Sequence, residues 1–178
     1  MENIIILNSN EKKKDIYIET VKEWIVSYEW DYFLTLTFKH PVYDKVKVSK
    51  AIEKFINRLS SLAFGSRSKK RIKAFSTIES GSLDSSLHVH MMVQDPRPLM
   101  LKENRCENFN LRNSVIESWL KSSSSAGHPA STGSSDEWMK KVTDVEGCIG
   151  YMVKEVGNNL DNCIAWDQLN LKGRKHVL

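Results

Sequence analysis

The chain has 178 residues, of which 40% are apolar and 27% are charged. This composition is typical of one globular domain and excludes a disordered, fibrous or low-complexity chain. Lysine and arginine outnumber aspartate and glutamate by 26 to 22, and this mild excess permits a nucleic-acid partner without requiring one. The three cysteines follow no disulfide or metal spacing, and no apolar run has the length of a signal peptide or a membrane span. We therefore expect a cytoplasmic protein with no membrane partner.

The first half of the chain predicts a helix, a strand, a second helix and a β-hairpin. Helical apolar spacing and β-branched runs assign these elements to residues 15–28, 31–38, 49–63, 72–79 and 87–94. The first helix belongs to an N-terminal extension, residues 1–30. Ser49 is the expected N-cap of the second helix, and a Ser/Gly turn at residues 80–86 closes the hairpin.

The second half predicts two more helices, separated by a serine-rich segment and a short strand. The first of these helices covers residues 110–121, and the segment 122–135 is expected to be a flexible loop that cannot pack in a core. Residues 137–142 are expected to form the short strand. The last helix begins at a capping box in residues 143–146, and Gly157 is placed to end it. This order predicts an α+β fold with one central antiparallel sheet and flanking helices.

The hairpin is expected to place two histidines and a carboxylate on one face. His88 and His90 are two residues apart on a strand, so both side chains point to the same side. The register that keeps apolar partners together on the opposite, core face pairs Glu79 with His88 and Thr77 with His90. Such a set can hold a divalent metal, and mixed nitrogen and oxygen ligands suit Mn²⁺ or Mg²⁺. A polar strand face in water is the alternative, and Asp84 in the turn is a second candidate for the carboxylate.

The last helix carries a tyrosine and a lysine on one side. Lys154 follows Tyr151 by three residues, and helical side chains lean toward the N-terminus, so the phenol ring is expected over Gly147. Gly147 and Gly150 each cost ~1 kcal/mol in a helix relative to alanine, which suggests that something approaches the backbone there. Tyr151 can attack a phosphodiester that a metal polarises, while Lys154 neutralises the developing charge. A tyrosine at the edge of a core beside a solvated lysine is the alternative interpretation.

Three stretches of the sequence together resemble the ordered motifs of the HUH endonucleases. They are residues 33–38 (FLTLTF), 88–90 (HVH) and 151–154 (YMVK). The similarity is greatest to the single-tyrosine rolling-circle replication initiators, or Rep proteins, of plasmids, phages and small single-stranded DNA viruses. In that family the motifs are a hydrophobic, threonine-rich strand, a His-hydrophobic-His pair, and a Tyr with a Lys three residues later. The resemblance spans residues 31–157.

This resemblance implies a fold, an activity and a set of site residues. The implied fold is a single domain with a sheet of about five antiparallel strands, of the ferredoxin-like or RNA-recognition type. The implied activity is a site-specific nick in single-stranded origin DNA, with a covalent 5′-phosphotyrosine intermediate and later rejoining, which starts rolling-circle replication. The implied ligands of Mn²⁺ or Mg²⁺ are Glu79, His88 and His90. Tyr151 is then the nucleophile and Lys154 assists it.

The resemblance also implies partners. The DNA partner is a single-stranded origin with a stem-loop. The chain shows no P-loop pattern, so the helicase domain fused to the viral versions is not expected, and a host helicase and polymerase would act in trans. An initiator from a eukaryotic virus would act in the nucleus. Two other functions stay open: a single-tyrosine HUH transposase of a small insertion sequence, and a non-catalytic nucleic-acid-binding domain of the same fold.

Cations, threonines and tryptophans supply the candidate DNA contacts. The cations and threonines are Thr35, Thr37, Lys50, Lys54, Arg58, Arg67, Lys69, Lys70, Arg71 and Lys73. For the basic run at residues 67–73, a solvated loop is the alternative. Trp30 and Trp138 are candidates for stacking on unpaired bases, whereas Trp119 lies on a helix stripe and is expected in the core.

Overall fold

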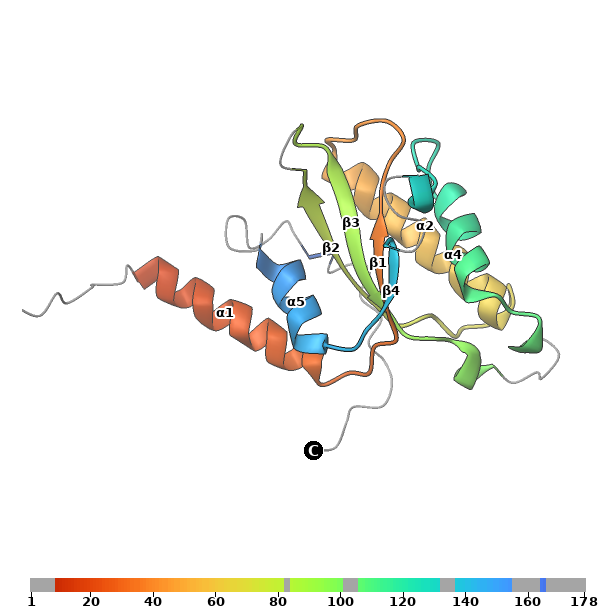
Figure 1. Ribbon diagram of the computed structural model, residues 1–178, viewed down its shortest axis with the longest axis horizontal. Helices are drawn as coiled ribbons and strands as arrows, with labels where there is room; N and C mark the ends of the chain where they lie inside the picture. The colour runs from red at the N-terminus through yellow and green to blue at the C-terminus, as the bar shows by residue number, and fades with distance from the viewer. Residues whose placement is uncertain (1–8, 82–83, 101–105, 132–136, 155–163, 166–178) are drawn as a thin grey trace, which may run out of the picture.

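The computed structural model describes residues 9–81, 84–100, 106–131, 137–154 and 164–165, with side chains from residue 15 onward (Figure 1). Its helices, 3₁₀ turns and strands follow one another in a βαββαβ core with one helix before it and one after it. The elements are α1 (Ser9–Val26), β1 (Tyr32–Leu36), α2 (Lys45–Phe64), β2 (Ala74–Ser80), β3 (Leu87–Val93), η1 (Arg97–Leu99), α4 (Leu111–Leu120), η2 (Pro129–Ser131), β4 (Met139–Lys141) and α5 (Val145–Val153).

The sheet has the strand order β2-β3-β1-β4, and each neighbouring pair is antiparallel. This arrangement confirms the predicted α+β class and its ferredoxin-like type. The described residues form four strands rather than the expected five. Beyond β2, Ile164 makes an isolated antiparallel bridge to Thr77, and a single bridge does not constitute a strand.

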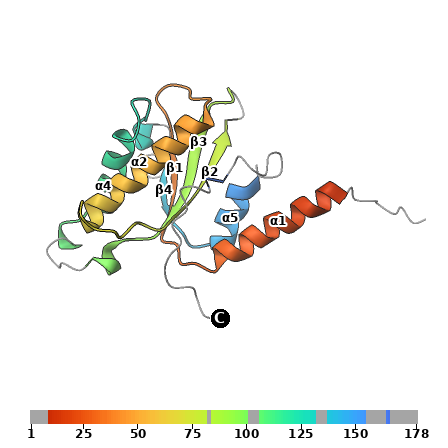
Figure 2. The same cartoon turned by 180° about the vertical axis from the view of Figure 1, so that it is seen from behind.

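Helices cover both faces of the sheet, as Figures 1 and 2 show from opposite sides. On one face α2 and α4 pack on each other and on the strands, around fully buried residues such as Leu34, Val89 and Trp119. On the other face α5 and the last part of α1 enclose a second cluster around Phe75 and Met92. Side chains alternate between the two faces along each strand. The second face therefore has room for a functional site where the helices leave it open.

The N-caps of two helices differ from the sequence prediction. The helix α2 begins four residues earlier than expected, because the Asp44 carboxylate accepts hydrogen bonds from the backbone N–H groups of Val46 (2.9 Å) and Lys47 (3.4 Å). Ser49 lies inside that helix, so its assignment as N-cap is wrong. Similarly, Asp144 rather than Thr143 caps α5, and a carboxylate there also interacts favourably with the helix dipole.

The described part of the serine-rich segment contacts the rest of the fold. Ala126 belongs to the larger core cluster and forms a bridge to Phe38, and the N–H of Gly127 donates to the carbonyl of Thr37 (3.0 Å). The Ser122 hydroxyl is buried and donates to the carbonyl of Trp119 (2.7 Å). The expectation that this segment cannot pack is therefore wrong for these residues, because alanine and hydrogen-bonded serine can be buried without large apolar side chains.

The three tryptophans considered for base stacking are buried. Trp30, Trp119 and Trp138 expose 6%, 0% and 4% of their surface. The prediction that Trp119 lies in the core is confirmed. The prediction that Trp30 and Trp138 offer free surfaces for base stacking is wrong, because both are buried. None of the described helices combines the length and the apolar character needed to cross a bilayer.

Candidate active site

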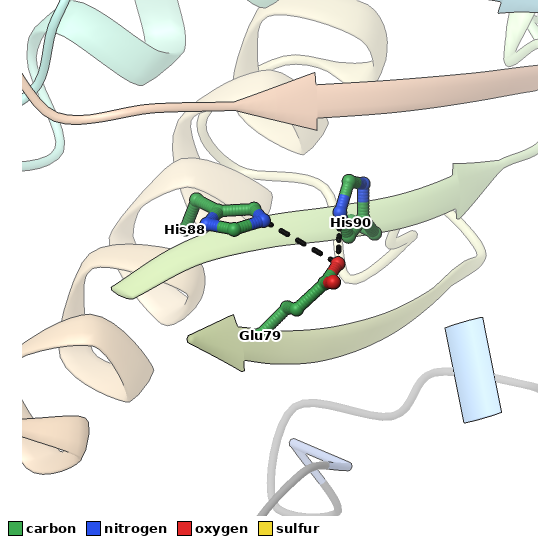
Figure 3. A group of neighbouring side chains, drawn as sticks. All are labelled: Glu79, His88 and His90. Atoms are coloured by element: carbon green, nitrogen blue, oxygen red, sulfur yellow. Dashed lines mark ion pairs between the residues drawn. The ribbon is translucent and has the colours of Figure 1, made fainter. Parts of the chain in front are cut away.

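The β2–β3 hairpin has the register that the apolar pattern predicted. Glu79 pairs with His88, Thr77 with His90, and Ile78 with Val89. Ile78 and Val89 lie in the core beneath α2, so the polar partners of the hairpin point to the opposite face. Glu79 and both histidines consequently share that face near the turn end of the hairpin (Figure 3).

Glu79, His88 and His90 bring three ligand-type atoms together. Glu79 Oε2 lies 2.6 Å from His90 Nε2 and 3.3 Å from His88 Nε2 (Figure 3). All three atoms lie within 4.8 Å of one another. Apart from this close approach to the carboxylate, the buried His90 Nε2 has no hydrogen-bond partner in the described part of the chain. Two imidazole nitrogens and a carboxylate oxygen that converge on one point are suited to a shared cation.

The electrostatics of His90 and Glu79 favour the protonation states that bind a metal. Burial lowers the pKa of His90 from its ordinary 6.5 to about 4, so the imidazole is neutral at pH 7. For Glu79, burial alone would raise the pKa, but the hydrogen bond from Lys154 and the positive charges that His90 and His88 can carry together hold it below its ordinary value. A neutral imidazole and an ionised carboxylate are the protonation states that coordinate a divalent ion.

Two residues of β1 surround His90 from its other side. The Phe33 ring is stacked on the imidazole, with ring centres 5.5 Å apart and an angle of 26° between the planes. The Thr35 hydroxyl lies 3.3 Å from His90 Nδ1. Sequence reasoning assigned Thr35 to DNA contact and gave Phe33 no role, because neither contact can be inferred without knowing that β1 lies beside β3.

The helix α5 brings Tyr151 and Lys154 to the same place. The Tyr151 ring packs edge-on against His90 with ring centres 5.0 Å apart, and the residue is 45% exposed. The Lys154 ammonium forms an ion pair with Glu79 Oε1 at 3.0 Å and lies 3.9 Å from the centre of the Tyr151 ring. The hydrogen bond to Glu79 is the main reason that the pKa of Lys154 is raised. The structure thus brings together five residues that the sequence selected from three separate segments.

The structure explains the glycine at position 147 in a way that the sequence did not indicate. A Cβ at this position would clash with the carboxylate of Asp144, which accepts a hydrogen bond from the Gly147 N–H (2.9 Å). The glycine therefore makes room for the helix cap. It also lines the groove beside Tyr151, so the expectation that it leaves space for a substrate stays a prediction. A Cβ at Gly150 would meet nothing within 4 Å.

A groove of about 490 Å³ runs beside the site, between the sheet and α5. Its lining includes Phe33, His90 and Tyr151, together with Lys140 from β4. Lys140 pairs with Phe33 across the β1–β4 ladder, so its exposed side chain lies on the same face of the sheet as the histidines. The sequence did not single out Lys140, because β4 is too short to give a clear strand pattern.

The helical cations predicted to contact DNA are far from this groove. Lys50, Lys54 and Arg58 are exposed on α2, which covers the opposite face of the sheet. The structure therefore does not bring these three residues together with the site.

The basic run between α2 and β2 is also separated from the site. It leads into the start of β2, whereas Glu79 lies five residues further along that strand, or about 17 Å at the usual rise. Arg67, Lys69, Lys70 and Arg71 are exposed, but Lys73 is only 8% exposed, so its expected role as a free DNA contact does not fit its burial.

Thr37, a candidate DNA contact, and Asp84, a candidate metal ligand, lie outside the cluster of Glu79 and the histidines. Thr37 lies just beyond β1, and its buried hydroxyl has no hydrogen-bond partner among the described residues, so it offers no free DNA contact. Asp84 is exposed in the hairpin turn, where its carboxylate accepts from the Ser86 N–H (3.0 Å), and it is not part of the metal-type cluster. Glu79 is therefore the carboxylate that the structure places with the histidines.

Comparison with known protein families identified a family that matches this chain. A family model described as a replication-associated protein matches residues 31–160, most of the chain, and this range includes all five site residues. Comparisons with curated proteins and with solved structures gave no match.

Proposed function

The chain belongs to this family of replication-associated proteins, and from this premise we propose that it nicks and rejoins single-stranded origin DNA to initiate rolling-circle replication. The observation that carries the proposal is the contact of the Tyr151 ring with His90, within a cluster that also holds Glu79 and His88. A nucleophile and a metal-type ligand set on one sheet face are what phosphodiester transfer requires.

The residues fit a divalent metal. Two imidazole nitrogens and one carboxylate oxygen converge, and apart from its close approach to Glu79 the buried His90 Nε2 has no hydrogen-bond partner among the described residues. Glu79, His88 and His90 would hold Mn²⁺ or Mg²⁺, which supplies polarisation of the scissile phosphate when bound.

Tyr151 acts as the nucleophile in this proposal. Its phenolic oxygen forms a bond to phosphorus while the bond from phosphorus to the 3′ oxygen breaks. The phenol loses a proton to solvent and the departing 3′ oxygen gains one, so a 5′-phosphotyrosine and a free 3′ hydroxyl result. Because one phosphoester replaces another, a 3′ hydroxyl can later attack the phosphotyrosine and rejoin the strand without an energy source.

Lys154 has an electrostatic role in this proposal. As an ammonium close to the Tyr151 ring, it stabilises the negative charge that builds up on the phosphate. Its raised pKa keeps it charged at neutral pH.

The DNA path follows the groove beside the site. Phe33 offers an aromatic edge for an unpaired base and Lys140 offers a cation for a phosphate. A stem-loop would present such an unpaired segment, and a helicase and a polymerase would act in trans as separate partners.

The experiment is cleavage of a randomised single-stranded library with Mn²⁺, Mg²⁺ or EDTA, followed by denaturing gel electrophoresis. Wild type is expected to form a covalent adduct only with metal, and Tyr151→Phe none. Tyr43→Phe is the matched control, since Tyr43 is also exposed, at 63%, but lies outside the site. An adduct that persists in Tyr151→Phe would rule out this nucleophile, and DNA binding without any cleavage would favour a non-catalytic binding domain.

A further inference from the structure

His90 lies between two threonines on the same face of the sheet. It is on β3, and the register places Thr35 of β1 directly opposite it on one side and Thr77 of β2 on the other. Both threonines are cross-strand neighbours of the imidazole, so each has the reach to influence it.

The two threonines differ in what their hydroxyls do. The Thr35 hydroxyl lies 3.3 Å from His90 Nδ1, the ring nitrogen that points away from Glu79. The Thr77 hydroxyl is buried and has no hydrogen-bond partner in the described part of the chain. The structure therefore contains a matched pair of positions, only one of which contacts the imidazole.

We propose that Thr35 is a positioning residue that orients His90 and selects its tautomer for metal binding. The proposal rests on the metal site of the proposed function. A histidine that binds a metal through Nε2 must carry its proton on Nδ1, and that N–H needs an acceptor. The Thr35 oxygen is such an acceptor at the observed distance.

A hydroxyl suits this position because it can accept or donate. Without metal, the Thr35 hydroxyl can donate to Nδ1 while Nε2–H faces the Glu79 carboxylate; with metal, Nδ1–H can donate to Thr35. Phe33 stacks on the ring and restricts its tilt, and the hydrogen bond from Thr35 to Nδ1 then selects between the two orientations that a ring flip would exchange.

The test compares Thr35→Val, Thr35→Ser and Thr77→Val in the full chain without DNA. Mn²⁺ affinity is measured by electron paramagnetic resonance or calorimetry, and the tautomer of His90 by the ¹⁵N chemical shifts of its imidazole. Valine has the shape of threonine and favours strands, and unchanged circular dichroism confirms the fold of each variant.

We expect Thr35→Val to weaken Mn²⁺ binding by about 10- to 100-fold, the usual effect of removing the hydrogen-bond partner of a ligating histidine. Thr35→Ser should restore most of the affinity, and Thr77→Val should leave it unchanged. The ¹⁵N shifts of His90 should change in Thr35→Val alone.

Equal losses in Thr35→Val and Thr77→Val would overturn the proposal, because the effect would then come from the strand rather than from the hydrogen bond. Unchanged affinity and shifts in Thr35→Val would also overturn it, even if wild type nicks DNA. If wild type binds no Mn²⁺, the metal site of the proposed function fails and Thr35 has no such role. A chain that binds Mn²⁺ with the expected Thr35 dependence but does not cleave DNA would overturn only the proposed function.

Discussion

Lys154 shares the Glu79 carboxylate with the atoms that would hold the metal. The ammonium is 3.0 Å from Oε1, while the other carboxylate oxygen lies 2.6 Å and 3.3 Å from the histidine nitrogens. A divalent ion and the lysine would therefore place two cations on one carboxylate. We predict that Lys154→Met binds Mn²⁺ more tightly than wild type while it forms less covalent adduct.

The magnitude follows from the geometry and the exposure of this ion pair. Coulomb's law with an effective dielectric constant of ~20 gives about 5 kcal/mol at such a separation. The Lys154 side chain is 42% exposed, however, and solvent screening reduces exposed ion pairs to about 1 kcal/mol or less. We use the smaller value, because removing the lysine increases the favourable free energy of Mn²⁺ binding only by the net energy of the Lys154–Glu79 ion pair. We thus expect an increase in affinity of about fivefold.

The assay is a Mn²⁺ titration of metal-free protein followed by electron paramagnetic resonance. Lys154→Arg keeps the charge and should bind Mn²⁺ much as wild type does. Lys121→Met removes a cation paired with Glu117 on the surface of α4, and so controls for the change in net charge. Weaker Mn²⁺ binding in Lys154→Met would refute the reasoning, since the lysine would then hold Glu79 in place rather than compete for it.

Three further predictions concern the helix cap, the buried histidine and the DNA path. Gly147→Ala should lower the free energy of unfolding by about 1 kcal/mol in urea melts by displacing the cap of α5, whereas Gly150→Ala, which has open space, should not be destabilising. In metal-free protein, burial lowers the pKa of His90 from its ordinary 6.5 to about 4, so the unfolded chain binds one more proton than the folded chain between these pH values. The free energy of unfolding should therefore fall by about 3 kcal/mol as the pH drops through that window. Urea midpoints measured across this pH range should depend less on pH in His90→Gln than in wild type. Lys140→Gln should weaken binding of single-stranded DNA and reduce its salt dependence, and Lys54→Gln should change neither, as fluorescence anisotropy at several salt concentrations can show.

The sequence predicted the metal-type cluster because strand periodicity is strict. A shift of one residue in the hairpin would move every side chain to the other face, so the apolar partners Ile78 and Val89 allow only the register observed. That register, together with one turn, determines where Glu79 lies relative to both histidines. Local contacts between adjacent strands are therefore the part of the site that sequence reasoning recovers well.

The remaining parts depend on contacts between segments that are distant in the chain. The proximity of Thr35 to His90 requires β1 to lie beside β3, and the place of Lys140 requires β4 to lie beside β1. Neither strand pairing can be predicted from the pattern of apolar and polar residues within each strand. The N-cap of α2 was misplaced for a different reason: both Asp44 and Ser49 are good caps, and the choice depends on where apolar residues such as Val48 reach the core.

The position of Tyr151, the proposed nucleophile, depends on the packing of the hairpin that also carries the proposed metal ligands. The helix α5 has nine residues, too few for an isolated helix to be stable in water, so tertiary contacts must hold it. Its buried residues Ile149, Met152 and Val153 pack in the cluster that contains Phe75 of β2 and Met92 of β3. These two strands also carry Glu79 and the histidines, on the same face. The same hairpin therefore supports the helix and presents Glu79 and the histidines, and packing in this cluster holds the Tyr151 ring against His90. An apolar-to-alanine change in the cluster is expected to move the phenol without changing any of the three proposed metal ligands.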